Sequence, residues 1–212
     1  MRTQSLYSLL FFFSLSLVSF ISTSDNNVFK RYHIKSGKVV YKYEGKASGT
    51  KELYFDNWGM KEAQLDNMTI EVYGMTQKTN NLVILDNKEV SVINLNTKKA
   101  YKSDSNEILK LQKINPEEKD LAKLSEQMLK DAGGNKLPNE NFLGKDCDVW
   151  DIHGVKQYSW KGIPLKIEIT IMGMDIKMTA TEISTDINIP SSKFEVPKGV
   201  VFEKESKVGF NF

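Results

Sequence analysis

Residues 165–184, LKIEITIMGMDIKMTATEIS, alternate between apolar and polar side chains, and the alternation continues through a turn. Successive side chains of a β-strand point to opposite faces, so this pattern predicts a hairpin with one dry and one wet side. A two-residue loop at Met172-Gly173 fits the hairpin length, and a loop one residue longer is the alternative, because tight hairpin turns favour a positive φ that Met172 does not readily adopt. This register pairs Ile171 with Met174, Ile169 with Ile176, Ile167 with Met178 and Leu165 with Ala180.

The same period of two runs through most of residues 37–104. Val39, Tyr41 and Tyr43 share one face of a predicted strand, and Leu53 and Phe55 share one face of the next strand, across the turn. Turn residues lie at 45–49, 56–59 and 86–88, between the predicted strands. Short strands with tight turns predict an antiparallel meander of about ten strands over the whole chain.

One segment has a helical period. Residues 116–132 follow Asn115, which can cap a helix, and Pro116 fits the first helical position. Apolar side chains recur at helical spacing on one stripe, and Gly133-Gly134 is a helix stop. The stripe consists of Leu121, Leu124, Met128 and Ala132.

The width of the predicted sheet determines its shape. Laid flat at about 4.8 Å spacing, about ten strands would span roughly 45–50 Å, whereas one helix is about 10 Å across. One helix therefore cannot shield the dry face of a flat sheet. We predict a mainly β fold: a strongly curved antiparallel sheet, or incomplete β-barrel, with a helical lid.

Two interpretations of the curved interior remain open. In one, the protein's own side chains fill the interior. In the other, a hydrophobic cleft remains for a ligand. Pliable methionines suit both a variable apolar ligand and an irregular core. The candidate cleft residues are Tyr41, Tyr43, Leu53, Phe55, Leu124, Met128, Trp160, Ile167, Ile169, Ile171, Met174, Ile176 and Met178. Trp160 can equally belong to the core.

The first 24 residues are typical of a secretory signal peptide. Met1-Arg2 supplies a positive start, residues 6–21 are apolar, and Ser22 and Ser24 occupy the small positions of a cleavage site. We expect cleavage after Ser24, a single mature domain over residues 25–212 and a periplasmic or secreted protein. The alternative is an uncleaved N-terminal anchor.

The charge pattern does not favour a nucleic-acid partner. The formal charge is +2, and removal of Arg2 with the signal peptide lowers it to +1. Lysines are scattered among acidic residues rather than concentrated on one basic segment. Cys147 is the sole cysteine, so no internal disulfide can form, and we expect it to be a buried small hydrophobe.

No motif for catalysis, a cofactor or a metal is recognisable. His33 and His153 lie in no zinc-binding spacing, and phosphate-binding and nucleophile-elbow motifs are missing. Cys147 and His153 fall about 20 Å apart at opposite ends of one predicted strand, too far for a nucleophile–base pair. Asp146, Asp148 and Asp151 are more typical of a solvated face than of a metal site. We therefore predict a non-enzyme without cofactor.

The C-terminal ending carries a family resemblance. Residues 189–199, IPSSKFEVPKG, fit the pattern I-P-x-S-x-F-x-V-P-x-G that resembles the ending of LolA/LolB-like periplasmic lipoprotein carriers. LGKDCDVWDI followed by YSWKGIPLK is similar to an uncharacterised family of secreted bacterial proteins grouped near them. The resemblance implies an incomplete β-barrel with a helical lid that binds acyl chains or lipidated proteins.

The chain departs from those carriers in two respects. It has one predicted helix where the carriers have several, and its sole arginine after the signal peptide is Arg31, which matches no gating arginine. We therefore expect a general role in binding an acyl chain, lipid or lipoprotein, with peripheral envelope contact. The alternatives are an envelope interaction or structural module with a filled interior and, third, a hydrolase. The sequence does not indicate an oligomeric state.

Overall fold

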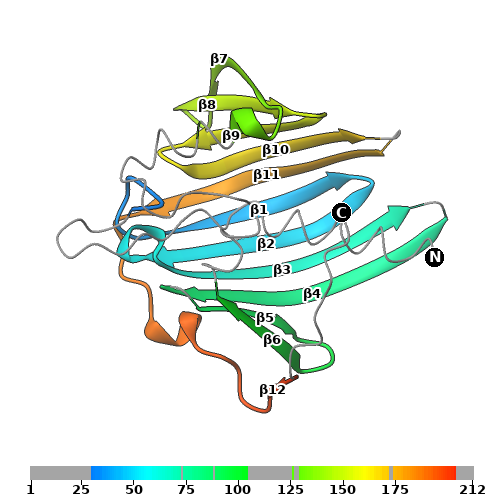
Figure 1. The fold of residues 1–212 in the computed structure, drawn as a ribbon, viewed down its shortest axis with the longest axis vertical. Coiled ribbons are helices and arrows are strands. Elements are labelled where there is room, and N and C mark those ends of the chain that lie inside the picture. Colours follow the sequence, from blue (N-terminus) through cyan, green and yellow to red (C-terminus); the bar gives the residue numbers. More distant parts are fainter. Residues whose placement is uncertain are drawn as a thin grey trace.

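The computed structural model describes residues 30–72, 74–87, 89–104, 126, 129–171 and 174–203. In this part of the chain, twelve strands form one curved sheet in the order β12-β6-β5-β4-β3-β2-β1-β11-β10-β9-β8-β7 (Figure 1). All neighbours are antiparallel except β12, which is parallel to β6. The mainly β, curved antiparallel sheet predicted from the sequence is confirmed, with twelve strands rather than about ten.

The strands and two short 3-10 helices have the following bounds. The first half comprises β1 (Gly37–Gly45), β2 (Ala47–Asp56), η1 (Asn57–Gly59), β3 (Lys61–Val72), β4 (Met75–Asp86), β5 (Glu89–Asn94) and β6 (Lys99–Asp104). The second half comprises β7 (Asn135–Phe142), β8 (Lys145–Ile152), β9 (Val155–Trp160), β10 (Ile163–Ile171), β11 (Met174–Thr185), η2 (Ser191–Phe194) and β12 (Val201–Phe202). The sheet is open, with β7 and β12 at its two edges.

The hairpin of β10 and β11 has the register predicted from its alternation. Ile171 pairs with Met174, Ile169 with Ile176, and Ile167 with Met178. Towards the other end of the hairpin, β10 has a bulge opposite β9, between Pro164 and Lys166. The two-residue connection is therefore confirmed by the pairing of the residues on either side of it.

The turn between β1 and β2 requires glycine. Gly45 has φ +88°, and a Cβ atom there would lie 2.2 Å from the carbonyl oxygen of Asp175. Lys46 then donates its backbone N–H to that same carbonyl at 2.8 Å. The close approach of β11 to this turn is thus possible only without a side chain.

Most of the helix predicted over residues 116–132 lies outside the described residues. Residues 129–131 are helical, and the chain then leaves the helix as expected. Gly133 donates to the Lys130 carbonyl and Gly134 to the Leu129 carbonyl, both at 2.8 Å, while Gly133 has φ +78°. This is a Schellman motif, so the predicted helix end is confirmed, whereas the described turn is too short to establish a lid.

The two faces of the sheet differ in what they carry. We call the face with Tyr41, Leu53 and Met178 the core face, because the paired strands place these residues on one side and all are nearly inaccessible. The opposite, outer face carries Lys42, Glu168 and Lys177. A single sheet with unlike faces needs cover on one of them.

A C-terminal strap, residues 186–200, covers part of the outer face. Ile189 and Phe194 on the strap form a buried cluster with Tyr54 of β2 and Ala63 of β3. Further along, Val200 packs on a second cluster on the same face. This cluster consists of Ile84 of β4, Ile93 of β5 and Ala100 of β6. In Figure 1 the orange strap with η2 runs beside these strands to β12 at the sheet edge.

The strap accounts for the sequence ending that carried the family resemblance. Ile189 and Phe194 of that ending are its buried anchors. The chain then continues as β12: Val201 donates its backbone N–H to the carbonyl of Lys98, just before β6, and Glu203, just after β12, donates to Ala100 of β6. The ending therefore has a structural role: it packs on part of the outer face and leads into β12, which pairs with β6 at the edge of the sheet.

Among the described residues, no helix has the length and apolar character needed to cross a membrane.

The strap predicts a specific stability effect. Phe194→Ala should lower the free energy of unfolding by about 3 kcal/mol, because it deletes a buried aromatic anchor. Val196→Ala is the matched control on the same strap, where the side chain is 38% exposed, and should cost about 0.5 kcal/mol or less. Urea unfolding of both variants measures the difference, and equal losses would show that the strap does not stabilise the sheet.

Candidate functional site

The core face is apolar over its central strands. The side chains of Val39, Leu53 and Leu165 are fully buried. They belong to one large cluster, which also contains Tyr41, Tyr43, Phe55, Ile167, Ile169, Ile176, Met178 and Ala180. Neighbouring strands supply these residues in register, so the apolar area is continuous from β2 through β1 and β11 to β10.

The structure brings together most of the residues predicted to line a cleft. Tyr41, Tyr43, Leu53, Phe55, Ile167, Ile169, Ile176 and Met178 are all in this core-face cluster, and none is more than 7% exposed. Trp160 is half-buried and packs against the cluster. Ile171 and Met174 are paired backbone neighbours, without described side chains, and Leu124 and Met128 lie outside the described residues. Whether these residues bind a ligand stays a prediction.

The segment before β1 covers one end of the core face. Tyr32 and Ile34 are buried in the same cluster, and the Tyr32 ring packs edge-on against Phe55 at 4.9 Å between centroids. Backbone hydrogen bonds tie this segment to two turns: Tyr32 donates to Trp58 and His33 donates to Lys161, each at 3.0 Å. Residues 30–36 therefore bridge the β2–β3 and β9–β10 connections.

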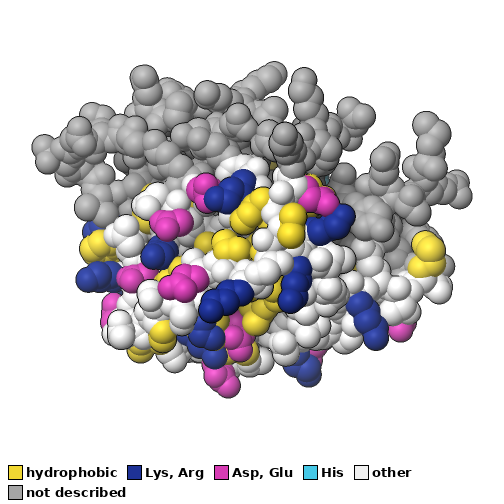
Figure 2. Space-filling view, turned by 90° about the horizontal axis from the view of Figure 1, so that it is seen from below, with side chains coloured by type: hydrophobic (Ala, Val, Ile, Leu, Met, Phe, Trp, Pro, Cys, Tyr) yellow, Lys and Arg dark blue, Asp and Glu magenta, His cyan; other side chains and the backbone are white. Residues whose placement is uncertain are grey.

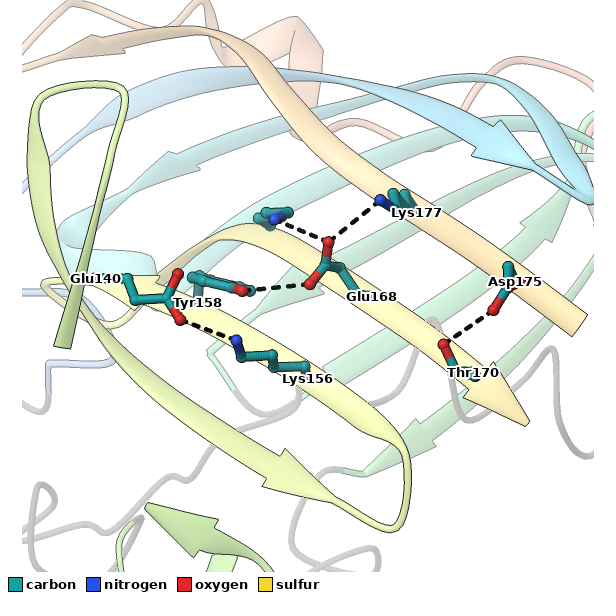
Figure 3. A network of polar contacts seen from close by, with 8 residues as sticks. Glu140, Lys156, Tyr158, Glu168, Thr170, Asp175 and Lys177 are labelled. Carbon is teal, nitrogen blue, oxygen red and sulfur yellow. Dashed lines mark hydrogen bonds and ion pairs between the residues drawn. The ribbon is translucent and has the colours of Figure 1, made fainter. Parts of the chain in front are cut away.

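The outer face of the same strands is polar. Glu168 on β10 accepts from the Tyr158 hydroxyl at 3.2 Å and forms ion pairs with Lys166 at 2.8 Å and Lys177 at 3.6 Å (Figure 3). Glu168 lies between Ile167 and Ile169 in the sequence, so adjacent residues serve opposite faces. The polar network of Glu168 therefore lies on the outer face, and the strands themselves separate it from the apolar core face.

Charges of both signs are interspersed on the surface. Figure 2 shows lysines and acidic side chains mixed over the described part of one side of the molecule. Exposed ion pairs such as Lys42–Glu44 at 3.0 Å and Lys156–Glu140 at 2.9 Å fit this mixture. The surface seen there has no single-sign patch of the kind that binds nucleic acid.

A row of polar residues interrupts the apolar core face. Glu62, Gln64 and Asp66 alternate along β3 on the side that faces the core, opposite Phe55, Leu53 and Lys51 of β2. Lys51 is 1%, Glu62 2% and Gln64 4% exposed. We call these four residues, with Arg31, the polar row.

The turn before β3, and not the hydrophobicity of β3 itself, is the sequence signal for this row. In KEAQLDNM, Ala63 and Leu65 have the apolar parity, so a reading by hydrophobicity alone assigns the acids to the wet side. The turn at Asp56–Gly59 fixes the register instead, because it pairs Glu62 with Phe55. Ala63 faces outward and is buried by the strap, which the local pattern does not reveal.

Arg31 forms a buried ion pair with this row. Its Nη1 atom lies 3.0 Å from Glu62 Oε2, and the two side chains are 3% and 2% exposed. The Tyr32 hydroxyl donates to the same oxygen at 2.7 Å. Glu62 therefore anchors the covering segment by two adjacent residues.

Burial shifts several pKa values in this region. Burial lowers the pKa of Lys51, although the carboxylates of Asp66 and Glu62 oppose this effect. Burial likewise raises the pKa of Asp66 against the opposing influence of Lys51 and Tyr43. Burial, together with the nearby Glu62 carboxylate, raises the pKa of Tyr32. The tyrosine is therefore a neutral hydrogen-bond donor to Glu62.

The residues considered for catalysis are not assembled into a site. Cys147 is fully buried at the start of β8, as expected, and burial raises the pKa of its thiol. His153 follows the other end of that strand, in the β8–β9 turn. Within the described residues, no group of three or more His, Cys, Asp or Glu side chains could hold a metal ion.

Sequence comparisons do not assign the chain to a family. No protein-family model matches it, and no curated protein matches it.

Comparison with solved structures shows the fold. An uncharacterized conserved protein from Thermus thermophilus superposes with a TM-score of 0.50 at 9% identity, over 82% of this chain and 92% of that chain. The Pseudomonas aeruginosa MucA/MucB complex gives 0.41 at 13% identity, over 76% of this chain but only 56% of that chain. A putative outer membrane lipoprotein-sorting protein domain from Vibrio parahaemolyticus gives 0.27 at 11% identity, over 77% and 91%.

LprF from Mycobacterium bovis and a DUF1329 family protein from Desulfovibrio piger are also among the structural neighbours. The superposition on the Thermus thermophilus protein shows a shared fold, and what the LolA/LolB-like resemblance of the C-terminal ending implies for function stays a prediction. At 9% identity, this likeness shows the sheet architecture alone.

The buried ion pair gives a testable prediction. Arg31→Met should destabilise the protein by about 3 kcal/mol, because it leaves the Glu62 carboxylate buried without its cation. The double variant Arg31→Met/Glu62→Gln should be less destabilised than Arg31→Met alone, because the unpaired charge is gone.

The matched control is Lys42→Met at the exposed pair Lys42–Glu44, with side chains 61% and 50% exposed. Its expected cost is about 0–1 kcal/mol. Denaturant unfolding provides all the values. A loss for Arg31→Met no larger than that for Lys42→Met would contradict the anchoring role of the pair.

Proposed function

We propose that this protein is a non-catalytic periplasmic or secreted carrier or binding protein, which holds lipid-like or lipidated ligands in a hydrophobic cleft against its core face. The observation that carries the proposal is the continuous apolar area from β2 to β10 on one side of a single open sheet. Covering such an area contributes about 25 cal/mol of favourable free energy per Å² of apolar surface removed from water, and an acyl chain can provide the apolar cover. The resemblance of the C-terminal ending to lipoprotein carriers supports the same class of ligand.

Location outside the cytoplasm is part of the proposal. It rests on the signal-peptide pattern of residues 1–24, which lie outside the described residues, and on the expected cleavage after Ser24. A carrier in that compartment would contact the envelope peripherally while it takes up or delivers its ligand.

Ligand entry would require movement of the cover. The buried residues of the core-face cluster are at most 7% exposed, so a ligand must displace whatever lies on them. The described part of the cover is the segment with Tyr32 and Ile34, held by Arg31 and Tyr32 on Glu62. Its release would open the end of the core face beside β3.

A second function is favoured by this same burial. If Tyr32, Ile34 and their neighbours fill the interior permanently, the protein would instead be an envelope interaction or structural module. Its free edge would be β7, which pairs only with β8 among the described residues. Such a module would bind no acyl chain, and Asn141→Lys on β7 would abolish capture of a discrete envelope partner.

The binding proposal is tested on delipidated full-length protein with the fluorescent probe N-phenyl-1-naphthylamine. We expect saturable binding that decan-1-ol displaces. Ile169→Thr should weaken probe binding about tenfold by adding a hydroxyl to the core face, whereas Thr170→Ile, the adjacent outer-face control, should leave it unchanged. Circular dichroism verifies that both variants are folded.

Two outcomes would count against the carrier. One is a folded, delipidated protein that binds neither probe nor alcohol. The other is protein purified from its native envelope that contains no lipid detectable by mass spectrometry.

A further inference from the structure

The polar row is costly in its surroundings. Gln64 is paired across the sheet with Leu53, and Glu62 with Phe55, both fully buried apolar residues. Polar side chains on such a face destabilise a fold unless each donor and acceptor has a partner. Each donor and acceptor of the polar row therefore needs a hydrogen-bond partner.

Both carboxylate oxygens of Glu62 have hydrogen-bond partners. Its Oε2 atom accepts from Arg31 at 3.0 Å and from the Tyr32 hydroxyl at 2.7 Å. Its Oε1 atom accepts from the side-chain amide of Gln64. Because a carboxylate can only accept, this contact fixes the NH₂ group of Gln64 towards Glu62 and its oxygen away from it.

Gln64 and Asp66 each have one side-chain oxygen without a hydrogen-bond partner. Asp66 Oδ2 accepts from the Tyr43 hydroxyl at 2.9 Å, but Asp66 Oδ1 and Gln64 Oε1 are buried without a hydrogen-bond partner. Arg31 Nε, a donor, is also buried and unpartnered. The two open acceptors belong to residues two apart on one strand face, so their backbones lie about 6–7 Å apart.

The charges of the row limit what can bind there. Arg31 and Lys51 supply two positive charges, and Glu62 and Asp66 supply two negative charges. A further buried cation would add to Arg31 and Lys51, while an anion would face two acceptor oxygens. An uncharged hydroxyl or amide matches the two open acceptors, because it donates a hydrogen bond and brings no further charge into the row.

We propose that the polar row is the headgroup subsite of the core face, and that it selects acyl-chain ligands whose polar end is uncharged and carries O–H or N–H donors. The inference rests on the proposed function, since the chain of the ligand would lie on the adjacent apolar area. It adds a ligand class: a neutral hydroxyl or amide end in preference to a free carboxylate or an ammonium.

The test compares three probes of equal chain length: decan-1-ol, decanoate and decylammonium. Displacement of N-phenyl-1-naphthylamine from delipidated full-length protein at neutral pH gives their affinities. We expect decan-1-ol to bind about tenfold or more tightly than either ion, and Gln64→Met to weaken decan-1-ol about five- to tenfold while leaving decanoate unchanged.

Leu53→Met is the matched control, because Leu53 lies directly opposite Gln64 on the same face. It should alter all three affinities equally, by about threefold at most. If Gln64→Met does not fold, the order of the three probes on the wild-type protein decides the question by itself.

The outcomes separate the two proposals. If the fluorescent probe binds but the three ligands displace it equally, or decanoate is preferred, the headgroup subsite is wrong while the apolar binding face stands. If neither the probe nor any of the three ligands binds to folded protein, the proposed function fails and the subsite fails with it.

Discussion

The structure depends on a single constraint, the burial of one side of a one-layer sheet. Strands β10, β11, β1 and β2 place isoleucine, methionine and tyrosine on the core face and lysine and glutamate on the other. No second sheet packs against this layer in the described part of the chain. The sheet therefore relies on chain segments that cross it, and the described ones are residues 30–36 on the core face and the strap on the outer face.

These two crossing segments meet at one end of the sheet. Asp186, at the start of the strap, donates its backbone N–H to Ser36 at 2.8 Å, and the Ser36 hydroxyl donates to the Ile187 carbonyl at 2.7 Å. The core-face cover and the outer-face strap are thus tied together where β1 begins and β11 ends. An opening of the core face at this end would have to release Arg31 and Tyr32 from Glu62.

The sequence predicted those features that local alternation determines. The β10–β11 register followed from parity and a two-residue loop, and Gly133-Gly134 marked the helix end. On β3, hydrophobicity alone indicates the wrong face, because Ala63 and Leu65 face outward and Glu62, Gln64 and Asp66 face the core. Ala63 is buried on the outer face by Ile189 and Phe194 of the strap. A pattern confined to β3 carries no information about this covering segment, which lies more than 100 residues away in the sequence.

The most direct test of the central claim uses isoleucine methyl groups, because both faces carry buried isoleucines. Methyl NMR of the full chain with a spin-labelled fatty alcohol should broaden the resonances of Ile167, Ile169 and Ile176 on the core face. The resonances of Ile84 and Ile93 on the outer face, and of Ile189 on the strap, should stay sharp. Broadening confined to the strap side, or absent from all six, would contradict the assignment of the core face as the ligand-binding surface.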